Sequence, residues 1–379
     1  MRESDTARTE NKPGVCLEIR DVVKKFPGVT AVDHINLEIQ NGEVFSFLGP
    51  SGCGKSTLLR VVAGLENQDQ GDVLIAGAVV NDLPPYKRDC STVFQNHALF
   101  PHMTVSGNIG FGLVERRLPK NEIKRKVSEK IELVNLKGME DRYPHQLSGG
   151  QMQRVALARS LVLEPKILLL DEPLAALDRK LRKEMQVELK RIQREVGTTF
   201  LNVTHDQKEA LSLSDRIAVM NQGKFLQIGT PSEIYEAPQT TFVADFMGAV
   251  NIFLGEVAST TDAVIELENK NGSRIFVPTP ENIGPDDIAG VSVHPELIRI
   301  RPWDHGAQAL DPKQHTAFRG IIKEVFYQGN FSEITVQLKE TDRPMVVHLT
   351  RGRGPEVRLS EGQDVCVSWQ CRYSNVLRK

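Results

Sequence analysis

The fold of this chain is decided by Val44-Phe45-Ser46-Phe47-Leu48 and the run that follows it, Gly49-Pro50-Ser51-Gly52-Cys53-Gly54-Lys55-Ser56-Thr57. The first five residues are mostly apolar, which is typical of a strand covered on both faces in a parallel sheet. The following run matches the pattern G-x-x-x-x-G-K-[ST], and an apolar helical start at Leu58 comes directly after it. In such a strand-loop-helix context, backbone N–H groups and the helix N-terminus bind phosphate. The sequence therefore predicts a phosphate-binding loop, and the alternative is an ordinary glycine-rich turn.

Each position of this loop has an expected role. Lys55 is predicted to reach the outer phosphates, and the hydroxyl of Ser56 is predicted to hold Mg²⁺. The remaining residues expected to contact the nucleotide are Ser51, Gly52, Cys53, Gly54 and Thr57. The loop by itself predicts a ligand with several phosphates, together with Mg²⁺.

A second buried strand is predicted at Ile167–Leu170, and two carboxylates follow it, Asp171 and Glu172. Open α/β sheets bind their ligands at the carboxyl ends of the strands. Adjacent side chains at a strand end point in different directions, so Asp171 suits the metal and Glu172 suits a general base facing water. A solvated acidic turn is the alternative reading.

The segment Leu147-Ser148-Gly149-Gly150-Gln151, followed by Gln153-Arg154, resembles the signature of the ATP-binding subunits of ABC transporters. The resemblance runs from about Val15 to Asn251. It implies that Ser148, Gly149, Gly150 and Gln151 of one subunit close over ATP held by the phosphate loop of another. The expected functional unit is then a head-to-tail homodimer with two ATP molecules between the chains.

The same resemblance implies roles for four more residues. Gln95 is similar to the glutamine that approaches Mg²⁺ and the attacking water, and His205 to the histidine that contacts the γ-phosphate. Asp178 is similar to a residue that crosses the dimer interface. Phe26 stands where the family places an aromatic ring against adenine, and a packed core phenylalanine is the alternative there.

The chain divides into two predicted domains. Residues 15–245 alternate apolar strands with helical periodicity, which predicts an α/β P-loop NTPase fold with a helical segment at about 96–160. Residues 246–379 consist of short strand-like runs broken by Gly, Pro, Asn and Asp, which predicts a small all-β domain. By resemblance this tail is an OB-like domain of the TOBE type. We expect it to stabilise the dimer, and a ligand-sensing module is the alternative.

Composition restricts the partners. The 379 residues carry 47 basic and 49 acidic side chains, so the net charge of −2 gives no basic surface for nucleic acid. The five cysteines match neither a disulfide framework nor a zinc site, which indicates a reducing cytoplasm. The first 14 residues lack the apolar core of a secretion signal, and no later run has the length of a membrane helix. We expect a peripheral protein on the cytoplasmic face of the inner membrane.

The resemblance finally indicates an importer ATPase that works with separate membrane permease subunits and, through them, with an extracytoplasmic solute-binding protein. The segments from Leu181 to Gln186, Gly229 to Tyr235 and Phe242 to Gly248 look most similar to spermidine and putrescine importers. Ferric iron, sulfate, phosphonate or sugar importers remain alternatives. An ATPase of DNA maintenance is disfavoured because those chains carry long coiled coils, and no sustained heptads occur here.

Overall fold

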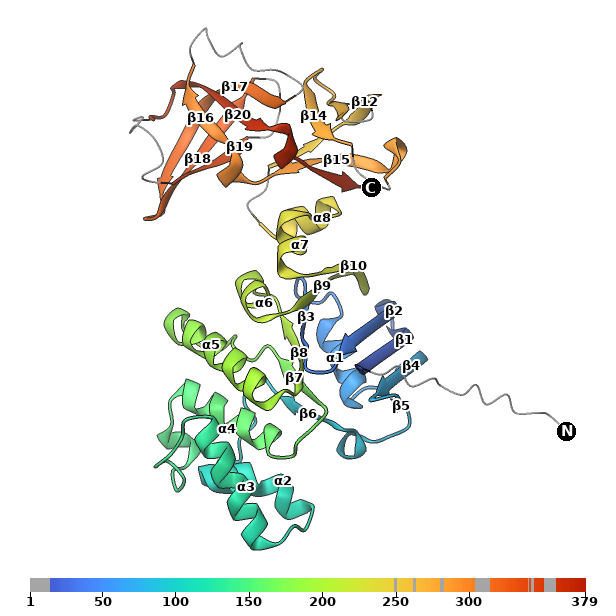
Figure 1. Cartoon of the computed structure of the whole chain (residues 1–379), viewed down its shortest axis with the longest axis vertical. Coiled ribbons are helices and arrows are strands. Elements are labelled where there is room, and N and C mark those ends of the chain that lie inside the picture. Colours follow the sequence, from blue (N-terminus) through green and yellow to red (C-terminus); the bar gives the residue numbers. More distant parts are fainter. Residues whose placement is uncertain are drawn as a thin grey trace, which may run out of the picture. The chain divides into compact units, whose positions relative to one another are not determined.

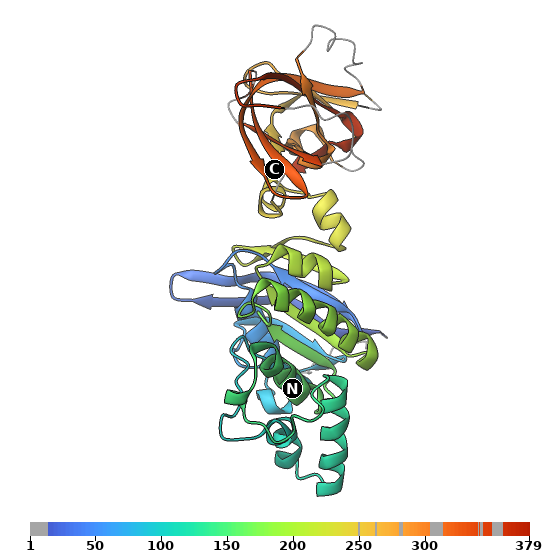
Figure 2. The same cartoon turned by 90° about the vertical axis from the view of Figure 1, so that its left-hand side faces the viewer.

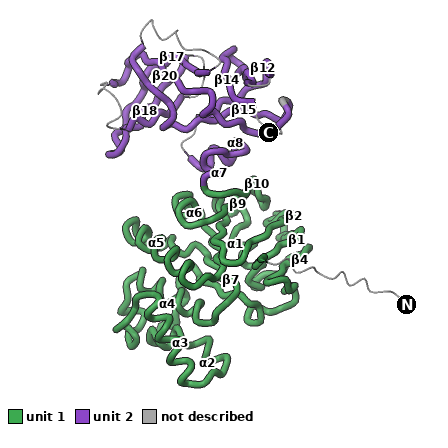
Figure 3. Tube along the Cα trace, viewed as in Figure 1, with its two compact units in different colours: residues 1–231 green, residues 232–379 purple. Residues whose placement is uncertain are grey.

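The computed structural model describes residues 14–248, 251–261, 264–279, 283–303, 314–339, 341, 344–350 and 359–379. The chain forms two compact units, Met1–Pro231 and Ser232–Lys379 (Figure 3). This division falls earlier than the boundary expected at 245/246, because two short helices group with the β-rich unit. The opening segment, expected to lack a secretion signal, lies outside the described residues except for its last one.

The first unit is built around a six-stranded sheet of order β10-β9-β3-β8-β7-β6. Its strands are β3 (Val44–Leu48), β6 (Cys90–Val93), β7 (Ile167–Asp171), β8 (Thr199–Thr204), β9 (Arg216–Asn221) and β10 (Lys224–Gly229). All neighbours pair in parallel except β10, which pairs antiparallel with β9. Every residue of β3 is buried, as the apolar run predicts for a central strand. The carboxyl ends of the five parallel strands therefore meet at one edge of the sheet.

A second, antiparallel sheet of order β2-β1-β4-β5 completes this unit. It contains β1 (Val15–Phe26), β2 (Val29–Gln40), β4 (Gln70–Ile75) and β5 (Ala78–Val79). Helix α1 (Lys55–Ala63) packs between the two sheets, where its Leu58 and Val62 share a core with Ile39 of β2 and Phe45 of β3. The sequence did not predict this sheet, because register shifts along β1 interrupt the period-two alternation that identifies a half-buried strand.

Helices cover the other side of the six-stranded sheet. They are α2 (Val105–Glu115), α3 (Lys120–Leu133), α4 (Gly149–Leu161), α5 (Arg179–Val196) and α6 (Gln207–Leu213), with short 3₁₀ turns η1 (Pro85–Lys87) and η2 (Pro144–Gln146). Figures 1 and 2 show α2, α3 and α4 gathered at one end of the unit, within the helical segment expected at about 96–160. Helix α5 ends at Gly197, whose φ of 69° is the left-handed geometry of a glycine cap.

The second unit opens with α7 (Pro231–Glu236) and α8 (Thr241–Phe246) and is otherwise β-structure. Its sheets are β11-β15-β21, β12-β13-β14 and β16-β20-β17-β18-β19. The strands are β11 (Asn251–Leu254), β12 (Glu256–Thr260), β13 (Val264–Glu268), β14 (Arg274–Pro278), β15 (Ile288–Val293), β16 (Arg299–Pro302), β17 (His315–Tyr327), β18 (Phe331–Leu338), β19 (Met345–Thr350), β20 (Asp364–Gln370) and β21 (Asn375–Arg378). The 3₁₀ turns are η3 (Pro285–Asp287), η4 (Pro295–Leu297) and η6 (Cys371–Tyr373).

The core of the second unit is aromatic at its centre. Trp369 is 2% exposed, and its ring stacks on Phe253 with centroids 5.5 Å apart. The predicted all-β character of the tail is thus confirmed, with α7 and α8 in addition. Within the described ranges, no helix is both long enough and apolar enough to cross a bilayer.

Candidate active site

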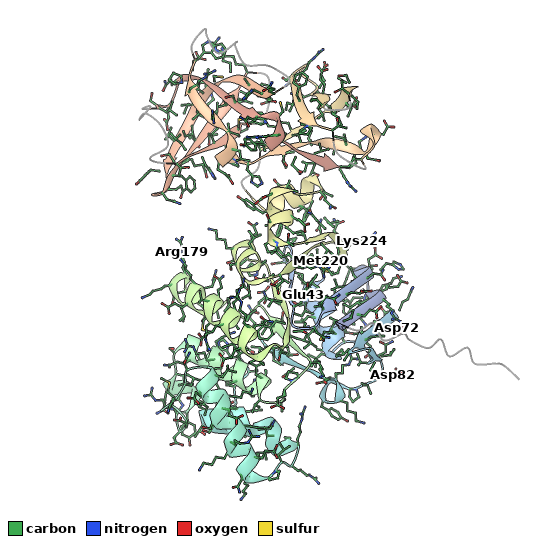
Figure 4. All side chains as sticks on the ribbon, viewed as in Figure 1. Glu43, Asp72, Asp82, Arg179, Met220 and Lys224 are labelled. Carbon is green, nitrogen blue, oxygen red and sulfur yellow. The ribbon has the colours of Figure 1, made fainter. Side chains whose placement is uncertain are left out.

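The phosphate loop follows the end of β3 and lies between the backbones of β9 and β2. A Cβ added to Gly49 would lie 2.2 Å from the carbonyl oxygen of Met220, which is labelled on β9 in Figure 4. A Cβ on Gly54 would lie 2.1 Å from the carbonyl oxygen of Ala31 on β2, and the φ of Gly54 is 112°. A side chain at either position would collide with main chain that cannot move independently, so these glycines are required by close approach.

Helix α1 begins directly at the loop, and its first N–H groups have no partner within the helix. Lys55, at the first position, is only 4% exposed. Its Nζ donates to the carbonyl oxygens of Gly49 at 2.9 Å and Pro50 at 2.8 Å. The ammonium is therefore held over the mouth of the loop, where a phosphate would meet both the charge and the helix N-terminus.

The other loop residues differ in exposure. Ser51 and Gly52 are exposed, whereas Cys53 is 5% exposed and its sulfur lies beneath Gly49. Any contact of Cys53 with a ligand would therefore be made by its backbone. The expected contacts of Ser51, Gly52, Cys53, Gly54 and Thr57 with nucleotide stay predictions.

Ser56 and Asp171 form the pair that could hold a divalent cation. The hydroxyl of Ser56 donates to Oδ1 of Asp171 at 3.2 Å, which joins α1 to the end of β7. Burial raises the pKa of the Asp171 carboxyl. No cluster of three His, Cys, Asp or Glu side chains is assembled for a metal in the described part of the chain. One carboxylate and one hydroxyl beside a phosphate loop nevertheless fit Mg²⁺, which commonly takes its other ligands from water and substrate phosphates.

Glu172 turns away from its neighbour Asp171. Its φ is 47°, a left-handed conformation that non-glycine residues adopt at a cost of roughly 1–3 kcal/mol. Its backbone N–H donates to the carbonyl of Val203 on β8 at 3.0 Å, which fixes the turn. The two carboxylates therefore face different partners, as expected for a metal ligand and a base.

Two side chains from neighbouring strand ends meet the Glu172 carboxylate. Nε2 of Gln95, beyond β6, donates to Oε2 at 3.4 Å. Nδ1 of His205, beyond β8, lies 3.1 Å from Oε1 and donates when it carries the proton. The side chain of His205 is 52% exposed and that of Glu172 is 23% exposed, so both can meet water. We call Gln95, Glu172 and His205 the strand-end cluster.

The signature segment lies at a different helix. Ser148 caps the N-terminus of α4, where its hydroxyl accepts from the N–H of Gln151 at 3.3 Å and its own N–H donates to Oε1 of Gln151 at 2.9 Å. Gly150 packs against Leu181, whose Cδ1 would lie 2.9 Å from an added Cβ. We call Ser148–Gln151 the signature turn. Its side-chain hydrogen bonds stay within the turn, so it presents a rigid helix N-terminus outside the strand-end cluster.

Asp178 and Phe26 are also placed by the structure. Oδ1 of Asp178 caps α5 by accepting from the N–H groups of Lys180 at 2.9 Å and Leu181 at 3.0 Å. The ring of Phe26 is 39% exposed at the end of β1, with Nζ of Lys24 at 5.2 Å from its centroid, so it is not a core side chain. The interface role of Asp178 and the adenine contact of Phe26 stay predictions.

Sequence reasoning missed a residue that supports the loop carrying Gln95. The guanidinium of Arg159 on α4 donates to the carbonyls of His97 at 2.9 Å and Ala98 at 2.7 Å. These two residues have φ values of 61° and 46°, so Arg159 holds a strained stretch of backbone. An arginine within a helical pattern carries no signal of such a contact, because the loop comes from a distant part of the chain.

Comparison with known proteins gives two family matches. Residues 32–175 match the ABC transporter family, and residues 291–373 match the TOBE domain family. A spermidine/putrescine import ATP-binding protein, PotA, from Rubrobacter xylanophilus is 44% identical over 98% of this chain and 96% of that protein. The protein of the same name from Thermobifida fusca is 47% identical over 92% of this chain and 88% of its own.

Two solved structures resemble the chain over part of its length. The first is cbiO1 from Clostridium perfringens, part of an ABC transporter complex, at 32% identity and a TM-score of 0.55 over 58% of this chain and 90% of that one. The second is the dimeric cassette MJ0796 bound to ADP and phosphate, at 32% identity and a TM-score of 0.51 over 57% and 98%. This second structure is a dimer in a post-hydrolysis state.

Proposed function

Because this chain belongs to the ABC transporter family of ATP-binding subunits, which couple ATP hydrolysis to transport, we propose that it powers the import of a polyamine, spermidine or putrescine. The observation that carries the substrate proposal is the extent of the similarity. It covers 98% of the chain and therefore includes the C-terminal unit as well as the ATPase unit. Both relatives named above carry spermidine and putrescine in their names.

The phosphate loop binds the nucleotide in this proposal. Lys55 and the first N–H groups of α1 bind the outer phosphates, and the buried ammonium exchanges its two carbonyl partners for phosphate oxygens. Ser56 and Asp171 would hold Mg²⁺, which supplies charge neutralisation at the phosphate oxygens when bound. Phe26 contacts the adenine from the exposed end of β1.

Glu172 is the general base. Its carboxylate accepts a proton from water as the water attacks the γ-phosphate in line, and the positions of Gln95 and His205 beside its two oxygens orient it. His205, half exposed, also contacts the γ-phosphate. Each group acts at a position fixed by a strand end, so little reorganisation is needed at the moment of reaction.

The site is completed by a second copy of the chain. The signature turn of that copy brings the hydroxyl of its Ser148 and the N-terminus of its α4 to the γ-phosphate, with Gly149, Gly150 and Gln151 around it. Asp178 lies at the same interface. The dimeric cassette with ADP and phosphate supports a dimer as the functional unit.

The remaining partners follow from the transport role. Permease subunits dock around residues 95–112, so that dimer closure and opening move the gate, and an extracytoplasmic binding protein delivers the solute to the permease. The chain is then peripheral on the cytoplasmic face of the membrane. The C-terminal unit stabilises or regulates the dimer.

The test is a reconstituted complex of this chain with its own permease. ATPase activity is measured while a cognate binding protein is supplied empty or loaded with spermidine, putrescine, ferric ion, sulfate, a phosphonate or a sugar. Stimulation by the polyamine-loaded protein is expected, and Gln95→Ala weakens that stimulation more than it weakens ATP binding. Stimulation by another solute and not by polyamines would refute the substrate and leave the importer role intact. No stimulation by any loaded protein would refute the importer role.

A further inference from the structure

A carboxyl group is buried beside the turn that carries His205. Glu209 on α6 is 3% exposed, and its Oε1 accepts from Nδ2 of Asn202 on β8 at 3.0 Å. Asn202 also reaches Oγ of Ser46 on β3 at 3.3 Å. Glu209 is therefore joined, through one amide, to the strand that leads to the phosphate loop and to the strand that leads to His205.

Glu209 contacts both neighbours of His205 in the sequence. The side chain of Thr204, which precedes the histidine, hydrogen-bonds to the Glu209 carboxyl. Asp206, which follows it, accepts from the N–H of Glu209 through Oδ1 at 3.1 Å. The N–H of Asp206 donates in turn to Oγ1 of Thr204 at 3.0 Å. The hydrogen bonds thus run from Asp206 to the Thr204 hydroxyl and from that hydroxyl to the carboxylate.

We propose that Glu209 is a positioning residue for ATP hydrolysis, whose ionised carboxylate holds the Thr204–His205–Asp206 turn so that His205 faces Glu172. The inference rests on the proposed role of His205. A hydroxyl has one proton to donate, and Thr204 can accept from Asp206 and donate to Glu209 together when the carboxylate is an acceptor. The backbone is then held on both sides of His205, whose Nδ1 lies 3.1 Å from Oε1 of Glu172.

Protonation of Glu209 changes the direction of these bonds. A carboxylic acid must place its own proton on an acceptor, and Oδ1 of Asn202 is a buried acceptor without a hydrogen-bond partner. Rotation of the Asn202 amide would bring that oxygen to the acid. The Thr204 hydroxyl then meets a neutral acid, which is a weaker acceptor than a carboxylate, so the His205 turn is held less firmly. Burial raises the pKa of Glu209 to about 7, so this change falls in the neutral range.

Few other charges act on Glu209. Strands β3 and β8, which α6 packs against, carry no ionisable side chain. From α5, Arg182 pairs with Oδ2 of Asp206 at 3.0 Å, and Lys190 donates to a backbone carbonyl of α6 at 3.2 Å. Asp215, just after α6, accepts from the backbone of β3 at 2.9 Å. Asp206 raises the pKa of Glu209 and Arg182 lowers it, and burial has the largest effect.

The experiment is the pH dependence of steady-state ATP hydrolysis by the full-length chain. Glu209→Gln is neutral at every pH and nearly isosteric, and it is expected to lower kcat at pH 8 on the order of 10- to 100-fold. KM for ATP should stay unchanged. The wild-type rise of kcat through about pH 7 should be missing from this variant. Loss of this pH-dependent rise in kcat distinguishes positioning by an ionised carboxylate from a merely structural role.

Two substitutions of Thr204 test the same hydrogen bond while Glu209 is left unchanged. Thr204→Val removes the hydroxyl and keeps the shape of this 2% exposed side chain, whereas Thr204→Ser keeps the hydroxyl. The valine variant should lose kcat as Glu209→Gln does, and the serine variant should retain it. If Glu209→Gln fails to fold, this pair decides the question. Infrared spectroscopy should also show a carboxylic acid band that disappears between pH 6 and 8 in the wild type and is absent in Glu209→Gln.

Wild-type kcat and pH profile in Glu209→Gln, or equal kcat in the two Thr204 variants, would overturn the proposal. His205→Ala separates this failure from failure of the proposed site. If His205→Ala abolishes hydrolysis while Glu209→Gln does not, the catalytic assignment stands and the positioning role is wrong. If His205→Ala hydrolyses ATP as the wild type does, both fail.

Discussion

The strand-end cluster and the signature turn are built in opposite ways. Gln95, Glu172 and His205 come from three parts of the chain, and the hydrogen bond between Gln95 and Glu172 joins residues 77 positions apart. The signature turn closes on itself, because the two side-chain hydrogen bonds of its cap join Ser148 only to Gln151, three residues away. A parallel sheet collects distant residues at one edge, whereas a helix N-terminus is completed by its own sequence. The first is assembled within one chain, and the second is a finished surface that would meet a second copy in the proposed dimer.

The two regions should therefore respond differently to substitution. The strand-end cluster depends on the left-handed backbone of Glu172 and on loops held from elsewhere in the unit. The signature turn depends on one cap, and loss of a serine cap typically costs about 1 kcal/mol. Changes in the cluster should affect chemistry inside one subunit, and changes in the turn should affect the site of the partner.

Glu172→Gln is expected to have the largest effect. The amide keeps the shape and one accepting oxygen but cannot take a proton, so ATP hydrolysis should fall roughly 10²- to 10⁴-fold. ATP binding should remain, and ATP-bound dimers should accumulate, as measured by size-exclusion chromatography with ATP and Mg²⁺. Glu184→Gln, at an exposed position of α5, is the matched control. Wild-type turnover without an ATP-dependent dimer in Glu172→Gln would show that another group is the base.

The next prediction tests whether the signature turn acts in the site of its own subunit (in cis) or in that of the partner (in trans). Ser148→Ala removes a hydroxyl expected at the γ-phosphate of the partner's site, and hydrolysis should fall on the order of 10²-fold. Lys55→Ala should also be inactive, because the phosphate loop loses its cation.

Mixing these two inactive variants tests where the signature turn acts. If it acts in trans, each hybrid dimer contains one site with both defects and one intact site, so activity returns. Activity of the mixture is measured after subunit exchange and compared with each variant alone. A mixture that stays inactive, although hybrid dimers form, would mean that the turn does not complete the partner's site.

Arg159→Ala is expected to have a smaller effect on the cluster. The loop loses two charged hydrogen bonds to the carbonyls of His97 and Ala98, so Gln95 is less well placed, and hydrolysis should fall about tenfold. The free energy of unfolding should fall by about 2 kcal/mol in denaturant titrations. Arg125→Ala, which breaks an exposed pair with Glu129, should change it by less than about 1 kcal/mol. Equal stability losses in the two variants would argue against a supporting role of Arg159 for this loop.

Removal of the second unit should have the smallest effect on the nucleotide site. All residues of the strand-end cluster, the phosphate loop and the signature turn belong to the unit Met1–Pro231. A chain that ends after Pro231, or after residue 245 as the sequence suggested, should bind ATP with unchanged affinity in calorimetry. Dimer stability or regulation should suffer instead. Loss of nucleotide binding in a folded truncation would show that the second unit contributes to the site.

Much of the fold could be predicted because its signals are local. The apolar run of β3, the glycine pattern before Lys55 and the spacing of apolar residues along α5 each specify a conformation within a few residues. Helix α4 likewise starts at Gly149, directly after its capping residue Ser148. The antiparallel sheet was missed, because the bulges of β1 are set by its pairing with β2 and β4 and leave no periodic signal.

The sequence by itself determined the phosphate loop, the signature turn and the buried strands β3 and β7, since glycine requirements, capping and periodicity act between residues close in the chain. Only the tertiary structure decided that Gln95 and His205 meet the two oxygens of Glu172 and that Glu209 is buried with hydrogen bonds to both sequence neighbours of His205. The physical reason is that burial and hydrogen-bond partners at these positions come from segments far away in the sequence. Burial and these partners strain the backbone and shift pKa values only after the sheet has brought those segments together.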